Sequence, residues 1–302
     1  MSGGVKLLIL RCYRNISIMK NVLTRSLTGL LYIVIILGAI FGGCLWFWGL
    51  TVLFGVLGIN EFNRISNKGR ISNTTVLLDI LAGVCLISAG SVISSAAHLP
   101  GFLASWNLST FLFAYIVCIV ARFVAQLYVQ DGDALAHYAH SFMAQVYVAL
   151  PMCLLGWLYS LTSPVFVLSV FILIWLSDTG AFCVGSLIGK HKLFERISPK
   201  KSWEGFFGGL FFCLVAAVAF SFCFPGDFKG MNLWQMLGLG AVVCVFGTWG
   251  DLVESLIKRT LGVKDSGNLL PGHGGILDRI DSLLLVVPAT LAYMLALAVL
   301  AC

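Results

Sequence analysis

Long apolar runs make up most of this chain, and the short segments between them carry most of its charged residues. The first run, residues 27–59, is 33 residues long. As a single helix it would extend about 50 Å, whereas the hydrocarbon core of a bilayer is about 30 Å thick. Gly42 and Gly43 lie near its middle, so we predict two short passes joined by a tight hairpin.

Seven further apolar runs are each long enough to cross a membrane as one helix. They cover residues 75–97, 108–130, 139–159, 164–189, 205–224, 232–253 and 282–301. Their hydrophobic residues are continuous and do not alternate with polar ones, which argues against an outer-membrane β-barrel. Together with the hairpin, they predict an all-α, polytopic helical membrane protein with about nine transmembrane helices.

Composition supports the same fold class. Hydrophobic residues make up 59% of the 302 residues and charged residues only 11%, against about 25% charged residues in soluble proteins. This excludes a water-soluble globule and a disordered chain. The ten cysteines are scattered without a CxxC pair, so we interpret them as small apolar residues of the interior.

The distribution of basic residues predicts the orientation of the chain. If the N-terminus is inside, the cytoplasmic segments are 1–26, 60–74, 131–138, 190–204 and 254–281, and they hold 17 of the 19 Lys and Arg residues. Only Lys229 lies on the opposite side, and Arg122, within a span, is expected to snorkel. This asymmetry places the N-terminus inside and the C-terminus outside. The net charge of +6 then reflects topology, and we predict no nucleic-acid partner.

Acidic residues are concentrated in the C-terminal part of the chain. Nine of the 13 lie between Asp178 and Asp281. Asp178 lies inside an apolar run, Asp251 near the end of another, and Asp278 directly before the last. An ionisable group at membrane depth indicates function by default, although structural pairing with a nearby Lys or Arg is the alternative for each. We therefore divide the chain into N-terminal transmembrane helices, 1–163 with the basic segment 1–26, and a C-terminal catalytic region, 164–302.

Helical spacing brings several of these groups together. One helix face would carry Asp251, Glu254, Ser255 and Lys258. Asp278 and Asp281 are three residues apart at the entry of the final helix. Carboxylates that converge from two helix ends are a usual way to hold Mg²⁺, which prefers oxygen ligands and bridges substrate phosphates.

Two segments have the character of phosphate sites. Residues 269–276 form a glycine-rich loop before a helix, where backbone N–H groups and the helix dipole favour an anion. The basic residues that flank it and would neutralise a triphosphate are Lys258, Arg259, Lys264 and Arg279. A second basic loop, 197–204, contains Lys200 and Lys201 and fits either an anion-binding turn or a lipid-headgroup cluster.

Other motifs are absent or weak. The sequence has no GxxxxGK[ST] loop and no GxGxxG motif. His137 and His140 are close to Asp131 and Asp133, but we do not predict a zinc site because a third strong ligand is lacking.

Residues 255–281, SLIKRTLGVKDSGNLLPGHGGILDRID, resemble the signature of the phosphatidate cytidylyltransferases, the CDP-diacylglycerol synthases of phospholipid synthesis. Segments 177–182, 198–206 and 250–255 also resemble family segments in the expected order. The resemblance is strong over about residues 170–285. The N-terminal half is similar to the family only in hydropathy, so no residue roles are transferred there.

The resemblance implies a nucleotidyltransferase that converts CTP and phosphatidic acid to CDP-diacylglycerol and pyrophosphate with Mg²⁺. It assigns the metal to Asp251 and Asp278, with Asp281 and Asp178 as further candidates and a monovalent cation such as K⁺ beside the Mg²⁺. The catalytic residues would be Asp251, Asp278, Lys258 and Arg279. Substrate and phosphate contacts would come from Lys200, Lys201, Arg259, Lys264, His273, Gly274, Gly275, Ser177 and Asp178. His273 is expected to contact phosphate or ribose rather than to act as a base.

The expected partners are CTP, phosphatidic acid and membrane lipids, with a homodimer left open. We expect a multi-pass protein of the inner (plasma) membrane whose active site faces the cytoplasm. An ion-coupled transporter is the first alternative, but it predicts charged groups along several mid-membrane helices. Another Mg²⁺-dependent lipid-phosphate or nucleotide transferase is the second. The DGxxAR pattern of CDP-alcohol phosphotransferases is not matched, because residues 131–136 read DGDALA.

Overall fold

The computed structural model describes residues 26–69, 71–92, 107–130, 133–228, 230–267 and 274–300. Eight of the helices in these ranges are long and apolar enough to cross a membrane, and the helix Ser26–Phe41 is a shorter apolar one. The chain is therefore an all-α, polytopic membrane protein, as the apolar runs predict.

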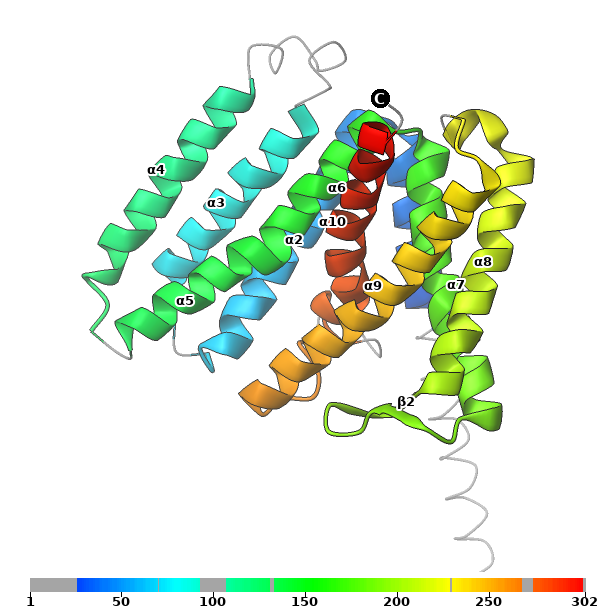
Figure 1. The fold of residues 1–302 in the computed structure, drawn as a ribbon. Coiled ribbons are helices and arrows are strands. Elements are labelled where there is room, and N and C mark those ends of the chain that lie inside the picture. The colour runs from blue at the N-terminus through cyan, green and yellow to red at the C-terminus, as the bar shows by residue number, and fades with distance from the viewer. Residues whose placement is uncertain are drawn as a thin grey trace, which may run out of the picture.

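The first apolar run is split where the sequence predicts. The helix Ser26–Phe41 ends just before Gly42 and Gly43, and α2 follows as Cys44–Ser66. Gly43 has a φ of 95°, a conformation that glycine adopts without strain. In Figure 1, α2 runs back from this turn toward the opposite end of the molecule, so the two helices form the expected hairpin.

The remaining elements follow in chain order. They are α3 (Asn73–Val92), α4 (Leu108–Gln126), α5 (Ala134–Ala144), a π-helical turn (Gln145–Ala149), α6 (Leu150–Leu161), α7 (Pro164–Ile188), β1 (Lys192–Phe194), β2 (Ser198–Ser202), α8 (Trp203–Cys223), a 3-10 turn (Pro225–Phe228), α9 (Leu233–Leu261) and α10 (Leu277–Leu300). The elements α5 to α6 form one continuous span, Ala134–Leu161. The antiparallel hairpin of β1 and β2 lies within a segment for which the sequence predicts only a basic loop.

The helices form two groups on either side of α10. Figure 1 shows α3, α4 and α5 on one side and α7, α8 and α9 on the other, with the β-hairpin at one end of the molecule and the C-terminus marked at the other end. The helix α7 packs on α8, and α9 packs on both α8 and α10. The helix α10 also packs against α6 and α2. The division of the chain at residues 163 and 164 stays a prediction, and α10 contacts helices on both sides of it.

Helix boundaries follow local sequence signals. Ser163 and Ser202 cap α7 and α8 by accepting a hydrogen bond from the backbone N–H three residues later. Asn232 and Gln235 form a capping box at the start of α9. Gly262, in the left-handed conformation, ends α9. The helix α9 therefore continues eight residues beyond the predicted apolar run and carries polar side chains out of the apolar region.

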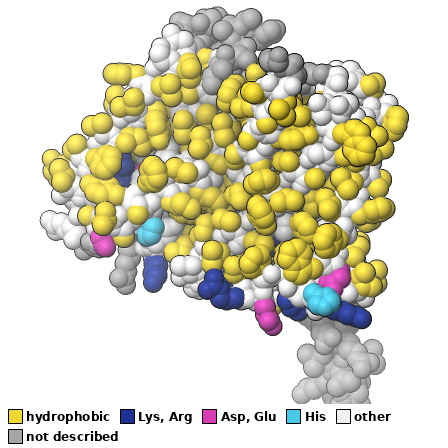
Figure 2. Space-filling model, viewed as in Figure 1, with side chains coloured by type: hydrophobic (Ala, Val, Ile, Leu, Met, Phe, Trp, Pro, Cys, Tyr) yellow, Lys and Arg dark blue, Asp and Glu magenta, His cyan; other side chains and the backbone are white. Residues whose placement is uncertain are grey.

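Surface composition agrees with a membrane environment. Large hydrophobic side chains are exposed along the flank of the molecule, whereas most of the charged side chains visible in Figure 2 gather at the end near the β-hairpin. This charged end is the one that the basic-residue asymmetry assigns to the cytoplasm.

A buried polar network joins the helices of the N-terminal half. Arg122 is 2% exposed, and its Nε lies 3.2 Å from Oδ1 of the fully buried Asp79. Asn63 donates to the other oxygen of Asp79 at 3.0 Å. The expectation that Arg122 snorkels is therefore wrong, because Asp79 on α3 supplies its counter-charge inside the bundle. His137 lies within hydrogen-bond distance of Gln126, 3.1 Å away, and so takes part in this network.

Candidate active site

A cavity of about 1090 Å³ opens at the charged end of the molecule. Its walls come from the β-hairpin, α7, α8, α9, the start of α10 and the segment that precedes it. Five acidic and five basic side chains line it: Asp178, Asp251, Asp265, Asp278, Asp281, Lys200, Lys201, Lys258, Lys264 and Arg279. The cavity thus collects most of the charged residues that the sequence marks as candidates.

The C-terminal part of α9 forms one wall of the cavity. Asp251, Glu254 and Lys258 lie on one face of this helix, as their spacing predicts. Oδ2 of Asp251 forms an ion pair of 2.6 Å with Nζ of Lys201, which reaches in from β2. The same Nζ donates to the carbonyl of Thr248 at 3.3 Å. Lys201 therefore links the hairpin to α9 at the cavity wall.

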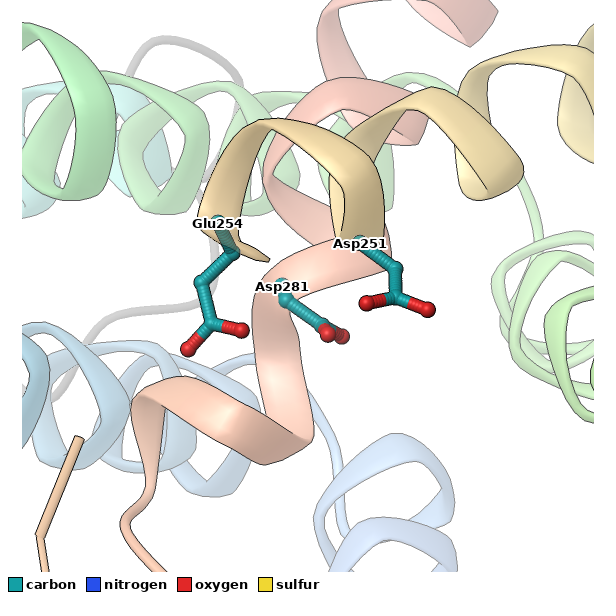
Figure 3. A group of neighbouring side chains, drawn as sticks. All are labelled: Asp251, Glu254 and Asp281. Atoms are coloured by element: carbon teal, nitrogen blue, oxygen red, sulfur yellow. The ribbon is translucent and has the colours of Figure 1, made fainter. Parts of the chain in front are cut away.

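Three carboxylates converge where α9 meets α10. Ligand oxygens of Asp251, Glu254 and Asp281 lie within 4.8 Å of one another, and Figure 3 shows the three side chains around one space. Glu254 is fully buried, and its Oε1 has no hydrogen-bond partner among the residues that the structure describes. A set of oxygen donors with an unsatisfied buried oxygen suits a hard divalent cation. The sequence pattern places Glu254 on the same helix face as Asp251, but it does not identify Glu254 as a metal ligand.

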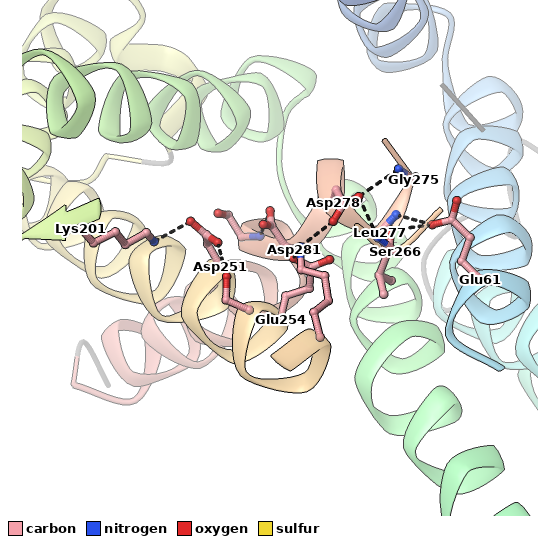
Figure 4. A network of polar contacts seen from close by, with 12 residues as sticks. Glu61, Lys201, Asp251, Glu254, Ser266, Gly275, Leu277, Asp278 and Asp281 are labelled. Atoms are coloured by element: carbon pink, nitrogen blue, oxygen red, sulfur yellow. Dashed lines mark hydrogen bonds and ion pairs between the residues drawn. The ribbon is translucent and has the colours of Figure 1, made fainter. Parts of the chain in front are cut away.

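Asp278 lies beside this cluster and is held by protein contacts. Nζ of Lys258 is 2.6 Å from Oδ1 of Asp278 and 2.5 Å from Oε2 of Glu254, so the ammonium bridges α9 and α10. Oδ2 of Asp278 accepts hydrogen bonds from the backbone N–H groups of Ser266 and Gly275, at 3.1 and 3.0 Å. Asp278 thus joins the two ends of the glycine-rich segment to the carboxylate cluster (Figure 4).

A further carboxylate reaches this segment from the N-terminal half of the chain. Glu61 on α2 accepts hydrogen bonds from Ser266, Ile276 and Leu277. These contacts join residues more than 200 positions apart in the chain, so no local pattern marks Glu61 as part of the site.

The β-hairpin is fixed against the start of α8. Glu204 in the first turn of α8 accepts hydrogen bonds from the backbone N–H groups of Lys190 and His191, at 3.1 and 3.2 Å. Its Oε1 also lies 2.6 Å from Nδ1 of His191. These contacts anchor the hairpin, and Lys200 and Lys201 then line the cavity.

The other candidates fall into three groups. Asp178, Lys264, Gly274 and Arg279 line the cavity. Ser177 is buried and donates to Sγ of Cys244 at 3.4 Å, and Arg259 is exposed on α9, so neither belongs to the cavity lining. His273 lies outside the described residues.

Comparison with known proteins identifies the family. The sequence model of the cytidylyltransferase family matches residues 23–297, which is most of the chain. The chain belongs to the cytidylyltransferase family. The match includes the N-terminal half of the chain, whose resemblance to the family rests on hydropathy alone when only motifs are considered.

Curated relatives of this cytidylyltransferase family member have one name in common. The phosphatidate cytidylyltransferase of Staphylococcus haemolyticus (strain JCSC1435) is 37% identical over 243 residues, which are 79% of this chain and 84% of the relative. The enzymes of that name from Staphylococcus aureus (strain COL) and Staphylococcus epidermidis (strain ATCC 12228 / FDA PCI 1200) are 52% and 49% identical over 123 residues. These two matches cover 41% of this chain and 46% of each relative, so the chain spans about half the length of these relatives.

Proposed function

We propose that this chain is a phosphatidate cytidylyltransferase, which transfers CMP from CTP to phosphatidic acid and releases pyrophosphate. The observation that carries the proposal is the charged cavity at the end of a membrane bundle in a member of the cytidylyltransferase family. A nucleoside triphosphate needs cations around it to neutralise its phosphates, and a lipid substrate needs a site next to the bilayer. The cavity offers both.

The carboxylate cluster supports a divalent metal in this proposal. Its donors are all oxygens, and Oε1 of Glu254 has no hydrogen-bond partner in the described part of the chain; both features suit Mg²⁺. We propose that Asp251, Glu254 and Asp281, with Asp278 beside them, hold the metal. When bound, Mg²⁺ supplies charge neutralisation at phosphate oxygens. A second, monovalent cation such as K⁺ stays a prediction.

The basic side chains bind and orient the nucleotide. Lys200, Lys264 and Arg279 line the cavity together with the carboxylates and would neutralise the β- and γ-phosphates. The phosphate monoester of phosphatidic acid is already anionic near neutral pH, so its attack needs no strong base. An oxygen of this monoester attacks the α-phosphorus of CTP in line, and the bond from that phosphorus to the pyrophosphate oxygen breaks. Positioning and charge neutralisation then account for most of the catalysis.

A second, smaller cavity suggests how the lipid reaches this site. Its volume is about 260 Å³, and it lies between the helix Ser26–Phe41, α7 and the start of α10. It shares Asp178, Asp278, Arg279, Asp281 and Ser282 with the larger cavity, while Phe171 and Trp175 line its apolar part. We assign the phosphatidate headgroup to this shared end, where Arg279 and the proposed metal would neutralise its phosphate, and the start of its acyl chains to the apolar part.

The orientation of the site in the membrane is part of the proposal. CTP is a membrane-impermeant cytosolic anion, so the cavity must open to the cytoplasm. The excess of basic residues on this side agrees with that orientation. We accordingly propose a location in the plasma membrane with phosphatidate entering from the inner leaflet. Whether the protein forms a homodimer stays open.

The proposal is tested with purified protein in lipid nanodiscs, phosphatidic acid and CTP labelled at the α-phosphate. We expect labelled CDP-diacylglycerol, which depends on Mg²⁺ and is lost when ATP or GTP replaces CTP or when diacylglycerol replaces phosphatidic acid. The matched control is Asp251→Asn, which should give almost no product. Labelled product from a polyprenyl phosphate, with none from phosphatidic acid, would assign the chain to a different transferase class.

A further inference from the structure

Glu61 is a buried carboxylate near the end of α2, in the half of the chain to which the sequence assigns no catalytic role. Its residue is 8% exposed. Oε1 accepts a hydrogen bond from the backbone N–H of Ile276 at 3.0 Å. Oε2 accepts from the N–H of Leu277 at 3.0 Å and from Oγ of Ser266 at 3.1 Å. Both carboxylate oxygens are therefore used, and each of their partners belongs to the segment around the glycine-rich loop.

The charge of Glu61 is compensated by backbone groups. Within the described part of the chain, its carboxylate forms no ion pair with a Lys or Arg. Leu277 is the first residue of α10, so Glu61 receives N–H groups from the positive end of this helix. A buried carboxylate that accepts such charge-assisted hydrogen bonds is favourable in place. Its role is that of an N-terminal cap supplied by a distant helix.

The backbone around Glu61 is shaped to bring it this close. A Cβ atom added to Gly275 would lie 2.4 Å from Oε2 of Glu61 and 2.1 Å from Oγ of Ser266. A side chain at this position would displace the Glu61 carboxylate or the Ser266 hydroxyl from their hydrogen bonds, whereas glycine leaves them in place. This glycine belongs to the stretch that resembles the family signature, and its packing partner in the structure is Glu61.

The segment held by Glu61 is the one that places Asp278. The N–H groups of Ser266 and Gly275 donate to Asp278. The hydroxyl of Ser266 and the N–H groups of Ile276 and Leu277 donate to Glu61. The segment is thus held between two carboxylates, one on each side (Figure 4). Release of the Glu61 contacts would leave the first turn of α10 with unsatisfied N–H groups and would free the side chain of Asp278 to shift.

We infer that Glu61 is a positioning residue for the cytidylyl transfer, which sets the start of α10 and thereby the position of Asp278 relative to Asp251. This inference rests on the proposed function. Glu61 touches neither the reacting phosphates nor the lipid in this account. It acts through the backbone that it binds, and it gives the N-terminal half of the chain a direct part in the geometry of the site.

The test compares Glu61→Gln with Asp133→Asn, which also removes one carboxylate but replaces an exposed N-cap by another good capping residue. In Glu61→Gln, the new side-chain amide would turn its NH₂ group toward a backbone donor, and the negative charge would be lost. We expect kcat to fall at least about tenfold and the Mg²⁺ concentration for half-maximal activity to rise, with KM for phosphatidate within about twofold of the wild type. Asp133→Asn should leave all three unchanged. Glu61→Gln with wild-type kcat and wild-type Mg²⁺ dependence would overturn the inference.

Hydrogen–deuterium exchange provides a readout that does not depend on activity. In Glu61→Gln, the peptide that contains Ile276 and Leu277 should exchange faster than in the wild type, while peptides from α8 should not change. Unchanged exchange at Ile276 and Leu277 would refute the anchoring itself. If the wild type makes no CDP-diacylglycerol, the proposed function fails, and the exchange result alone decides the anchoring.

A milder variant covers the case in which Glu61→Gln does not fold. Ser266→Ala removes one of the three hydrogen bonds to Glu61 and leaves both backbone contacts. We expect a smaller loss of kcat in the same direction, with the same rise in the Mg²⁺ requirement. A Ser266→Ala enzyme that loses only thermal stability, with kcat and Mg²⁺ dependence unchanged, would reduce Glu61 to a structural role.

Discussion

Lys258 is the residue whose replacement tests the charge balance of the site most directly. Its ammonium lies 2.5 Å from Glu254 and 2.6 Å from Asp278, and its side chain is 11% exposed. The variant Lys258→Met retains a side chain of similar length and removes the charge. It leaves two largely buried carboxylates without their cation, next to Asp281.

The size of the effect follows from these distances. At 2.6 Å, Coulomb attraction amounts to about 6 kcal/mol per contact for an effective dielectric constant of about 20. Most of this is offset by the cost of desolvating the charges, but removing one partner of a buried pair costs about 3–5 kcal/mol. At about 2 °C per kcal/mol for a large chain, Tm should fall by roughly 6–10 °C.

A divalent cation should restore part of this stability. The variant has one positive charge fewer in the carboxylate cluster, so Mg²⁺ should bind it more tightly than the wild type. A ligand at a hundred times its Kd adds about 2.7 kcal/mol of stability, which corresponds to roughly 5 °C here. We therefore expect Mg²⁺ to raise Tm of Lys258→Met by more than it raises Tm of the wild type.

The assay is thermal unfolding in detergent, followed by tryptophan fluorescence, with EDTA or with saturating Mg²⁺. Lys190→Met, which removes an exposed ammonium, is the matched control and should shift Tm little. Equal Tm values for Lys258→Met and Lys190→Met would refute the estimate of the buried contacts. Equal Mg²⁺ shifts in the wild type and Lys258→Met would refute the idea that the ammonium and the metal neutralise the same carboxylates.

Three further predictions concern other parts of the molecule. Asp251→Asn and Asp278→Asn should each leave less than about a tenth of wild-type turnover at saturating Mg²⁺ in a folded protein, because each replaces an anionic side chain at the proposed metal site by a neutral one of similar size; higher turnover would exclude that residue from a role at the metal. Asp79→Asn or Arg122→Met alone should destabilise the bundle by about 3–5 kcal/mol, and the double variant by less than the sum, because no buried charge is left unpaired; strict additivity in thermal unfolding would contradict this. A single thiol at Asn268 in a cysteine-depleted chain should react with an impermeant maleimide only in inside-out vesicles and be protected by CTP with Mg²⁺; labelling in right-side-out vesicles would reverse the topology.

The sequence predicts the bundle well, because a membrane span leaves a strong one-dimensional signal. The turn predicted at Gly42 and Gly43 is present, and each apolar run after it corresponds to an observed helix. The end of α9 is less accessible to this reasoning. Hydropathy ends the span at residue 253, whereas the left-handed cap at Gly262 ends the helix. Gly262 is a sequence signal for the end of a helix, and on this signal the predicted helix reaches Leu261 and includes Lys258 in its last turns.

The β-hairpin was outside the reach of pattern analysis. Its strands are three and five residues long, which is too short for a periodic pattern to identify them, and Ser202 at the end of β2 is the one buried position in the two strands. The hairpin depends on Glu204, which lies in the first turn of the next helix, α8. Its carboxylate accepts hydrogen bonds from the backbone N–H groups of Lys190 and His191. Such an anchor has no local signature, because Lys190 and His191 lie 14 and 13 residues before Glu204 in the chain.

The N-terminal half illustrates the same limit on a larger scale. Resemblance and spacing identify acids that share a helix face, and they miss Glu61 because its partners are 205 to 216 residues away. Two residues after Glu61 on the same helix, Asn63 donates to Asp79, the partner of Arg122. The final turns of α2 are therefore fixed on one side by a buried ion pair and fix the start of α10 on the other. On this argument, the N-terminal helices act as a rigid support for the catalytic segment. Any variant that loosens α2 should consequently affect metal binding before it affects the anchoring of the protein in the membrane.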